Sequence, residues 1–324
     1  MISLLEVESG GLLTTVQDLG RVGRQRSGLT PGGTMGPFAA SVANLLLGNP
    51  RGAAVLEITL LGPALRFLAE TQIAVCGGDL SAALDGEPLP LWKTAAVTAG
   101  QRLLFGRRRS GARAYLAVSG GFRVPEVAGS RATFLRGKLG GLEGRALRPG
   151  DILPGVVLPR IAGERGLRRS EQPAYDLPAI LRVLPGPHFP YFADAGQAAF
   201  FAASYTISPQ SDRQGYRLVG PVVSRTDSGD LLSEPMPLGG IQVPPDGQPI
   251  LLMADRQTTG GYPLIGVVCS ADIPRAAQLA PGDAVRFVPV SLADAVAAAI
   301  SAERRLRLLE LMSGSDGRNL TDGR

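Results

Sequence analysis

The chain has 324 residues, a length that accommodates two domains of ordinary size. Hydrophobic residues make up 44% of it, which excludes a chain that is disordered throughout. The formal charge of +5 comes almost entirely from arginines interspersed with acids, and only 5% of the residues are aromatic, so a nucleic-acid surface is not indicated. The short basic run at residues 107–109 is interpreted as a solvated turn.

Cysteine usage and the distribution of apolar runs predict a cytoplasmic protein. Cys76 and Cys269 each lie in an apolar stretch, which favours buried thiols in a reducing compartment over a disulfide. The first residues lack the basic and apolar regions of a secretory signal. No apolar run approaches the roughly 18 residues of a membrane span.

Short strands are expected to dominate the fold, because the 43 glycines and 26 prolines follow no regular period and indicate many tight turns. The first exception along the chain is residues 37–47, whose apolar side chains recur at helical spacing until Gly48. Residues 195–203 are a shorter candidate helix. Strand-like apolar or β-branched runs occur at residues 72–75, 114–118, 250–253 and 284–288.

The clearest helix is predicted near the C-terminus, over residues 291–312. It begins with Ser291 and Asp294 at the spacing of a capping box, and it ends in arginines that suit a helix C-terminus. The polar tail after Ser313 is expected to be flexible.

A linker is expected between residues 159 and 175, where the apolar pattern gives way to Arg, Gly, Glu and Ser. The two halves are faintly alike, since residues 75–80 (Val-Cys-Gly-Gly-Asp-Leu) have a counterpart at 268–273 (Val-Cys-Ser-Ala-Asp-Ile). Two unrelated strand–turn segments would explain the same likeness. A real repeat would give a mainly β protein with a few helices and two similar β-barrels. The expected division is residues 1–165, 166–290, and 291–324 for the C-terminal helix and tail.

Several kinds of site are absent from the sequence. The single histidine, His188, excludes a zinc site of several histidines, and without a Gly-x-Ser-x-Gly motif it is interpreted as a turn or surface residue. No Gly-x-x-x-x-Gly-Lys-Ser/Thr phosphate loop and no Met-Lys-Met biotin-attachment motif occurs. If ATP or biotin takes part in the chemistry, a partner protein must therefore supply it.

Polar residues are concentrated in three segments between strands. In the first, residues 14–21, Gln17 could bind a substrate and Asp18 could handle a proton; the alternative is a turn in which Asp18 bonds local backbone N–H groups. In the second, residues 208–218, arginines can hold a small carboxylate through paired hydrogen bonds. The alternative there is an internal ion pair of Arg213 with Asp212 or Asp227. The substrate-binding candidates in this second segment are Gln210, Arg213, Tyr216 and Arg217.

The third segment, residues 242–263, is the richest. Its amide and hydroxyl groups can donate to a carbonyl oxygen or accept from a lactam N–H, and Asp255 or Thr258 can take part in proton transfer. Glycines there would let backbone N–H groups approach a ligand closely. The alternative is a polar turn capped by Asp255. We expect the second and third segments to meet at one site for a compact acid; the substrate-binding candidates of the third are Gln242, Gln248, Gln257, Thr259, Gly260, Gly261 and Tyr262.

Together these segments resemble the Kip-antagonist, or allophanate hydrolase subunit 2, family of carboxyltransferase-type domains, which includes the C subunit of bacterial ATP-dependent 5-oxoprolinase. Relatives form part of the carboxyltransferase region of urea carboxylase. The resemblance covers residues 3–290, and its motifs are 14–21, 43–49 (Ala-Asn-Leu-Leu-Leu-Gly-Asn), 56–59 (Leu-Glu-Ile-Thr), 114–121 (Ala-Tyr-Leu-Ala-Val-Ser-Gly-Gly), 208–218 and 242–263.

The resemblance implies cyclophilin-like β-barrels and a role in opening the lactam of 5-oxoproline to glutamate at the expense of ATP. It also implies two partner subunits of the same enzyme: a Kip-inhibitor-like B subunit and a separate A subunit. The sequence departs from the family pattern twice. Gly36 stands where an Asp is expected before Pro37, and Leu264 stands where a Lys or Arg is expected after Pro263.

Two alternatives stay open at this point. The chain could be the carboxyltransferase component of a biotin-dependent urea or amide carboxylase, which would need a biotin-carrying partner. It could also be a regulator without catalytic activity that binds a kinase-inhibitor-like protein.

Overall fold

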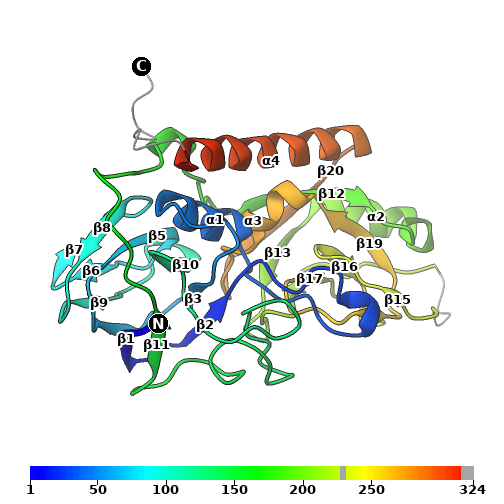
Figure 1. Ribbon diagram of the computed structural model, residues 1–324. Helices are drawn as coiled ribbons and strands as arrows, with labels where there is room; N and C mark the ends of the chain where they lie inside the picture. Colours follow the sequence, from blue (N-terminus) through cyan, green and yellow to red (C-terminus); the bar gives the residue numbers. More distant parts are fainter. Residues whose placement is uncertain (227–230, 315–324) are drawn as a thin grey trace. The chain divides into compact units, whose positions relative to one another are not determined.

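The computed structural model describes residues 1–226 and 231–314 (Figure 1). The chain divides into two compact units. The first comprises Met1–Val22, Gly32–Ala174 and Arg304–Arg324, and the second comprises Gly23–Pro31 and Tyr175–Glu303. Neither unit is one continuous stretch. The division into residues 1–165, 166–290 and 291–324 stays a prediction. The predicted flexible tail, from residue 315 onward, lies outside the described residues.

The first unit contains two antiparallel sheets. The six-stranded sheet has the order β11-β1-β4-β9-β6-β7, and the five-stranded sheet has the order β2-β3-β10-β5-β8. The strands are β1 (Ile2–Ser9), β2 (Leu13–Gln17), β3 (Val55–Thr59), β4 (Ala64–Phe67), β5 (Thr71–Asp79), β6 (Ala83–Leu84), β7 (Glu87–Pro88), β8 (Thr94–Val97), β9 (Arg102–Leu104), β10 (Ser110–Val118) and β11 (Ile152–Gly155).

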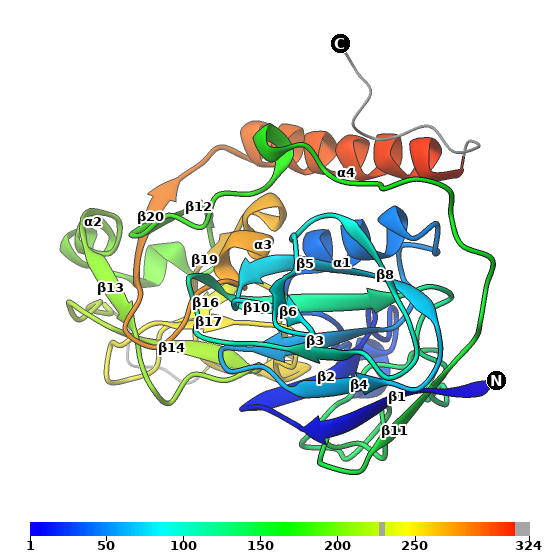
Figure 2. The same ribbon diagram turned by 90° about the vertical axis from the view of Figure 1, so that its left-hand side faces the viewer.

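Both faces of the five-stranded sheet are covered, because successive strand residues point to opposite sides. Leu56 of β3 belongs to an apolar core that it shares with Phe67 of the other sheet. Val55 faces the opposite way and packs in the cluster of helix α1 (Pro37–Leu46), which runs beside β5 and β10 in Figure 2. Double coverage explains why β5 and β10 have almost no exposed residues.

The predicted C-terminal helix is confirmed as α4 (Leu292–Gly314). At its start the Ser291 hydroxyl accepts a hydrogen bond from the backbone N–H of Asp294 at 3.1 Å, as the capping-box spacing predicts. Its second half belongs to the first unit, where Leu309 joins the core cluster of α1. The guanidinium carbon of Arg305 lies 4.8 Å from the ring centre of Phe38.

The second unit is built on a closed barrel with the strand order β12-β19-β16-β17-β14-β13-β20. The parallel neighbours β12 and β20 close the ring, and the other neighbours are antiparallel. A two-stranded sheet of β15 and β18 accompanies it. The strands are β12 (Ala179–Pro185), β13 (Ser204–Ile207), β14 (Gly215–Val219), β15 (Glu234–Pro235), β16 (Gly240–Gln242), β17 (Ile250–Leu252), β18 (Thr259–Gly260), β19 (Leu264–Val268) and β20 (Ala284–Pro289).

Short helices complete the fold. The candidate at residues 195–203 is confirmed as α2 (Asp194–Ala202). The remaining ones are α3 (Ile273–Ala276) and the 3-10 helices η1 (Gln25–Ser27), η2 (Arg169–Glu171), η3 (Phe189–Tyr191) and η4 (Ser270–Asp272).

The expected mainly β fold is confirmed, but the expectation of two similar barrels is not: a closed barrel occurs in only one of the two units over the described residues. The apparent repeat explains the difference. Residues 75–80 lie mostly inside the long strand β5, whereas residues 268–273 leave the end of β19 and enter η4 and α3. Similar local residues therefore adopt different structures in the two units. In the described parts of the chain, no helix combines the length and apolarity needed to cross a membrane.

Replacing Leu309 with Ala should destabilise the first unit by about 2–4 kcal/mol, because a leucine that is 6% exposed leaves a cavity under α4. Leu308 is 61% exposed, so Leu308→Ala should change stability by less than about 0.5 kcal/mol. Urea denaturation of the full-length chain, followed by circular dichroism, measures both. Equal losses of unfolding free energy in the two variants would contradict the packing of Leu309 in the core cluster of α1.

Candidate functional site

Two loops of the second unit are joined at one end of the barrel, where β14 begins and β17 ends. β14 and β17 pair antiparallel, with Gly215 opposite Leu252. The pairing continues beyond the strands, since the N–H of Met253 donates to the carbonyl of Gln214 and the N–H of Asp255 donates to the carbonyl of Arg213, both at 2.8 Å. The second and third polar segments of the sequence thus lie side by side at this end of the barrel.

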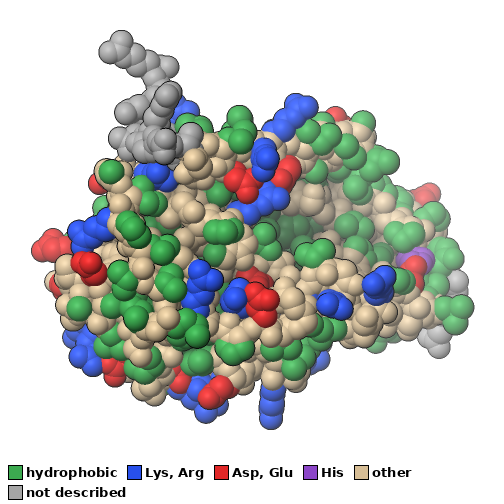
Figure 3. Space-filling model, viewed as in Figure 1, with side chains coloured by type: hydrophobic (Ala, Val, Ile, Leu, Met, Phe, Trp, Pro, Cys, Tyr) green, Lys and Arg blue, Asp and Glu red, His purple; other side chains and the backbone are tan. Residues whose placement is uncertain are grey.

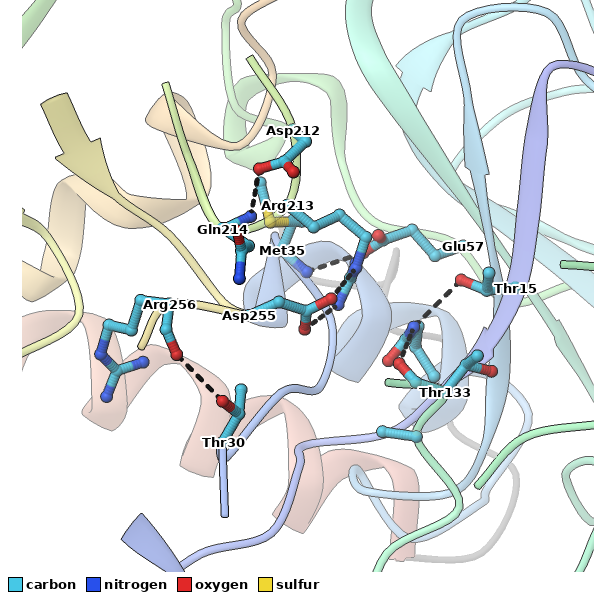
Figure 4. Close-up of polar contacts among 12 residues, drawn as sticks. Thr15, Thr30, Met35, Glu57, Thr133, Asp212, Arg213, Gln214, Asp255 and Arg256 are labelled. Atoms are coloured by element: carbon cyan, nitrogen blue, oxygen red, sulfur yellow. Dashed lines mark hydrogen bonds and ion pairs between the residues drawn. The ribbon is translucent and has the colours of Figure 1, made fainter. Parts of the chain in front are cut away.

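A buried ion pair spans these two loops. The Arg213 guanidinium donates to both carboxylate oxygens of Asp255, from Nε to Oδ2 at 2.9 Å and from Nη2 to Oδ1 at 3.1 Å (Figure 4). Each residue is only 4% exposed. Of the alternative partners that the sequence suggested, Asp212 accepts from the backbone of Gln214 at 2.7 Å, and Asp227 lies outside the described residues.

The other candidates of the second segment differ in their exposure to solvent. Tyr216 is buried and its neighbour Arg217 is exposed, as expected for successive residues of strand β14. Gln210 is exposed, and its side chain contacts the Ser208 hydroxyl. The structure therefore separates Arg213 and Arg217 by environment: one is compensated by Asp255, and the other faces solvent.

A chain of side-chain amides lies beside β18. Gln257 Nε2 donates to Gln242 Oε1 at 2.8 Å, and Gln242 Nε2 donates to the carbonyl of Tyr262 at 3.3 Å. Gly260 packs against both amides, because a Cβ there would lie 2.9 Å from Gln242 Nε2 and 3.2 Å from Gln257 Nε2. Gly260 thus allows close packing against these side chains, and its approach to a ligand stays a prediction.

The remaining candidates of the third segment differ in the contacts that hold them. The carbonyl of Thr258 accepts from the N–H of Met236, and Thr259 is exposed in β18. A Cβ on Gly261 would meet the carbonyl of Leu231 at 2.9 Å, and Tyr262 is exposed. Gln248 is engaged away from this chain of amides, since its amide bonds both the N–H and the carbonyl of Gly220 at 3.1 Å.

Arg256 fastens the N-terminal segment Gly23–Pro31 to this loop. Its Nε donates to the carbonyl of Met236 at 2.9 Å, and its Nη2 donates to Gln25 Oε1 at 3.1 Å. The carbonyl of Arg256 in turn accepts from the Thr30 hydroxyl at 3.0 Å (Figure 4). Burial lowers the pKa of the Arg256 guanidinium. Sequence reasoning missed both Gln25 and Arg256, although an arginine inside a polar loop was a usable signal.

His188 lies in a turn, as interpreted from the sequence, but it is not a surface residue. Its side chain is mostly buried, with Nδ1 accepting from the N–H of Leu264 at 3.1 Å and Nε2 lying 3.0 Å from Glu234 Oε1. Because Nδ1 accepts, the ring proton of the neutral imidazole belongs on Nε2, directed at Glu234. His188 thereby links the start of β19 to β15.

In the first unit, Asp18 accepts the local backbone hydrogen bond that the sequence offered as an alternative, and it also binds a loop far along the chain. Its Oδ1 accepts from the N–H of Gly20 at 2.8 Å and from the Ser130 hydroxyl at 2.6 Å, and its Oδ2 accepts from the N–H of Arg131 at 2.6 Å. These bonds fix the loop around residue 130 against the end of β2.

Gln17 is fully buried beside it. Its Nε2 donates to the Thr15 hydroxyl at 3.0 Å and to the Thr133 carbonyl at 3.1 Å (Figure 4). Its Oε1 has no hydrogen-bond partner within the described part of the chain.

The two departures from the family pattern fit their surroundings. The N–H of Met35 donates to the buried Glu57 carboxylate at 2.7 Å, and the N–H of Gly36 donates to the Tyr115 hydroxyl at 2.8 Å. A Cβ on Gly36 would lie 2.9 Å from that hydroxyl, so an Asp there would displace Tyr115. Leu264 packs in an apolar cluster of the barrel. Sequence reasoning cited Glu57 only within a motif and missed its contact with the backbone.

Two further features of the described residues are the grouping of metal-ligating side chains and the distribution of surface charge. Over the described residues, no group of three or more His, Cys, Asp or Glu side chains is placed to hold a metal ion. On the face drawn in Figure 3, basic and acidic side chains are interspersed among apolar ones, without a continuous basic surface.

A family model described as carboxyltransferase domain, subdomain A and B, matches residues 27–289. The chain is a member of the carboxyltransferase domain family. The match begins inside the segment Gly23–Pro31 and ends with the last barrel strand, β20. It therefore includes the Arg213–Asp255 pair and the whole polar loop after β17.

Curated relatives of this carboxyltransferase-family protein match nearly the full chain. It is 41% identical over 300 residues to the 5-oxoprolinase C subunit of Escherichia coli K12, covering 91% of this chain and 94% of that one. It is 38% identical to the 5-oxoprolinase C subunit of Haemophilus influenzae, covering 91% and 93%. Among solved structures, the urea carboxylase of Kluyveromyces lactis matches with a TM-score of 0.89 and 32% identity, covering 96% of this chain but 29% of that one.

Replacing Arg213 with Ala should destabilise the second unit by about 3–5 kcal/mol, because it leaves the Asp255 carboxylate buried without its cation. The exposed Arg217 is the matched control, and Arg217→Ala should stay within about 0.5 kcal/mol of the unmodified chain. Denaturant unfolding provides the measurement. The double variant Arg213→Met, Asp255→Leu should recover most of the loss, since two apolar side chains leave no unpaired charge. A stable single variant would mean that the pair does not hold the loops.

Proposed function

We propose that this chain is the C subunit of an ATP-dependent 5-oxoprolinase, which opens the lactam ring of 5-oxoproline to give glutamate. The observation that carries the proposal is the match to the two 5-oxoprolinase C subunits, which extends over more than nine-tenths of each chain. A relative that shares only one domain would not match along both units. The chain is therefore an enzyme subunit, one component of a hydrolase that opens a cyclic amide.

The activity requires partners. We infer a Kip-inhibitor-like B subunit of the same enzyme, and an A subunit, as the resemblance implies. A lactam is a resonance-stabilised amide and a poor electrophile, so transfer of a phosphoryl group from ATP to its oxygen would make attack by water feasible. The absence of a phosphate-loop motif from the sequence supports ATP binding on one of these partners.

Within this chain, the loop after β17 is the proposed substrate-contacting segment. Gln257 and Thr259 are proposed to orient the ring amide, and Asp255 or Thr258 to take part in proton transfer. The support is preorganisation: Gln242 holds the Gln257 amide, and Arg213 holds Asp255. The other candidates of the second and third segments stay proposed as surrounding groups. Gln17 and Asp18 remain a second proposed set, in the first unit.

Two structural proposals accompany the functional one. We infer that the closed seven-stranded barrel is of the cyclophilin-like type that the resemblance implies. We also infer that the two units are separate domains, because each has its own apolar clusters.

A biotin-dependent carboxyltransferase is the second candidate function. The family description and the structural match to the K. lactis urea carboxylase favour it. It would require a biotin-carrying partner, because this chain has no Met-Lys-Met motif. A neighbouring gene for such a protein, together with urea- and bicarbonate-dependent ATP turnover by the assembled complex, would decide for the carboxylase.

The complex of this chain with its co-encoded partners should form glutamate from 5-oxoproline only when ATP and all subunits are present. Mass spectrometry of the product over time checks this. A stable complex that hydrolyses neither lactam nor amide would instead favour the regulatory alternative.

Gln257→Ala should lower kcat/KM of the complex for 5-oxoproline about 10-fold, the equivalent of one lost hydrogen bond of about 1.4 kcal/mol. Gln197 is the matched control, because its amide donates to the carbonyls of Phe189 and Phe192, away from the proposed site residues. Gln197→Ala should leave kcat/KM unchanged. Equal kinetics for all three proteins would remove Gln257 from the site.

A further inference from the structure

Arg256 is a buried cation whose hydrogen-bond partners among the described residues are neutral. It is 8% exposed, and its two side-chain hydrogen bonds go to the carbonyl of Met236 and the amide oxygen of Gln25. No carboxylate of the described residues lies within ion-pair distance of its guanidinium. Two other arginines of the same unit are compensated, Arg213 by Asp255 and Arg182 by Asp272.

An unpaired charge at this depth is unfavourable, because desolvation of the guanidinium is not offset by an opposite charge. Burial is also the physical cause that lowers the pKa of Arg256, and arginine does not lose its proton in proteins even so. The loop therefore keeps a full positive charge that no group in the described chain neutralises. An anionic ligand would supply the missing compensation.

The guanidinium retains hydrogen-bond donors for such a ligand. Of its five N–H donors, two bind acceptors of the described residues, one on Nε and one on Nη2. Both N–H groups of Nη1 and one of Nη2 remain, and these form the fork that binds a carboxylate through two parallel hydrogen bonds. Gln25 is itself fixed, since its Nε2 donates to the carbonyls of Met236 and Thr258 at 3.0 and 3.1 Å. The fork thus has a defined direction before any ligand binds.

We propose that Arg256 binds the carboxylate of a small cyclic amide acid through Nη1 and Nη2. This assignment replaces Arg213 and Arg217 as the carboxylate-binding arginines, since the first is neutralised by Asp255 and the second is exposed. It depends on the proposed function for the identity of the ligand. The next residues along the chain are Gln257, proposed to orient the ring amide, and Thr258, proposed as a candidate for proton transfer.

The test compares 5-oxoproline with pyrrolidin-2-one, the same ring without a carboxylate. Isothermal titration of the complete complex should show at least about 10-fold tighter binding of 5-oxoproline, the effect of one charge-assisted hydrogen-bonded pair. Arg256→Ala should weaken 5-oxoproline binding by about 10- to 100-fold and leave pyrrolidin-2-one binding unchanged. Arg256→Lys should fall between them, because an ammonium keeps the charge but loses the planar fork.

The exposed Arg286 of β20 provides a matched control for loss of one positive charge, and Arg286→Ala should bind both compounds like the unmodified complex. Equal weakening of both compounds by Arg256→Ala would assign Arg256 a structural role and overturn the inference. Unchanged binding of 5-oxoproline by Arg256→Ala would overturn it as well.

Failure of this inference and failure of the proposed function give different results. An unmodified complex that forms glutamate, with Arg256 variants that keep the same KM, would leave the function intact and remove Arg256. An unmodified complex that discriminates the two ligands but forms no glutamate would leave the carboxylate site intact and remove the proposed function. If Arg256→Ala does not fold, the lysine variant and the ligand preference of the unmodified complex still decide, because an unmodified complex that binds both compounds equally has no carboxylate site.

Discussion

The buried pair of Arg213 and Asp255 determines the geometry of the proposed site. Two backbone hydrogen bonds extend the β14–β17 ladder past the ends of the strands, and the bidentate ion pair closes this extension. A polar loop after a barrel strand would otherwise have few apolar contacts to hold it. With the pair in place, the residues after Asp255 leave the barrel in a fixed direction. The positions of Arg256 and Gln257 are consequences of that direction.

The two joined loops each carry a buried arginine, and the two arginines have different hydrogen-bond partners. Arg213 has a carboxylate at hydrogen-bonding distance, so the pair contributes rigidity with no net charge. Arg256 has only neutral acceptors among the described residues, so its charge stays available to a ligand. Exposure would not distinguish them, because both are largely buried. The charge of the neighbouring acceptors distinguishes the two arginines. It assigns a structural role to Arg213 and a binding role to Arg256.

The features that could be predicted from the sequence are those set by local pattern. The helix at residues 37–47, the capped C-terminal helix and the mainly β character are all expected from spacing within a short window. The partner of Arg213 could not be predicted, because it depends on the antiparallel register that sets residue 213 beside residue 255. The role of Gln25 was equally hidden, since its contacts lie more than 200 residues away in the chain.

The apparent repeat shows the same limit of prediction from local sequence. Six similar residues continue a strand in one unit and leave it in the other, and closure of the barrel depends on pairing of the distant strands β12 and β20, which no short motif encodes.

The two departures from the family pattern, Gly36 and Leu264, are explained by the groups that surround them. At residue 36 the Tyr115 hydroxyl occupies the space that a side chain would need, and it binds the N–H group there. At residue 264 a leucine joins Met236 and Leu252 in an apolar cluster, where a cation would be buried without compensation. The Asp expected at residue 36 and the Lys or Arg expected at residue 264 are thus both absent. The groups around each position leave no favourable place for the missing charge. Within the described part of the polar loop, the buried charge that remains uncompensated is that of Arg256, so recognition of an acidic substrate falls to the loop that the Arg213–Asp255 pair holds.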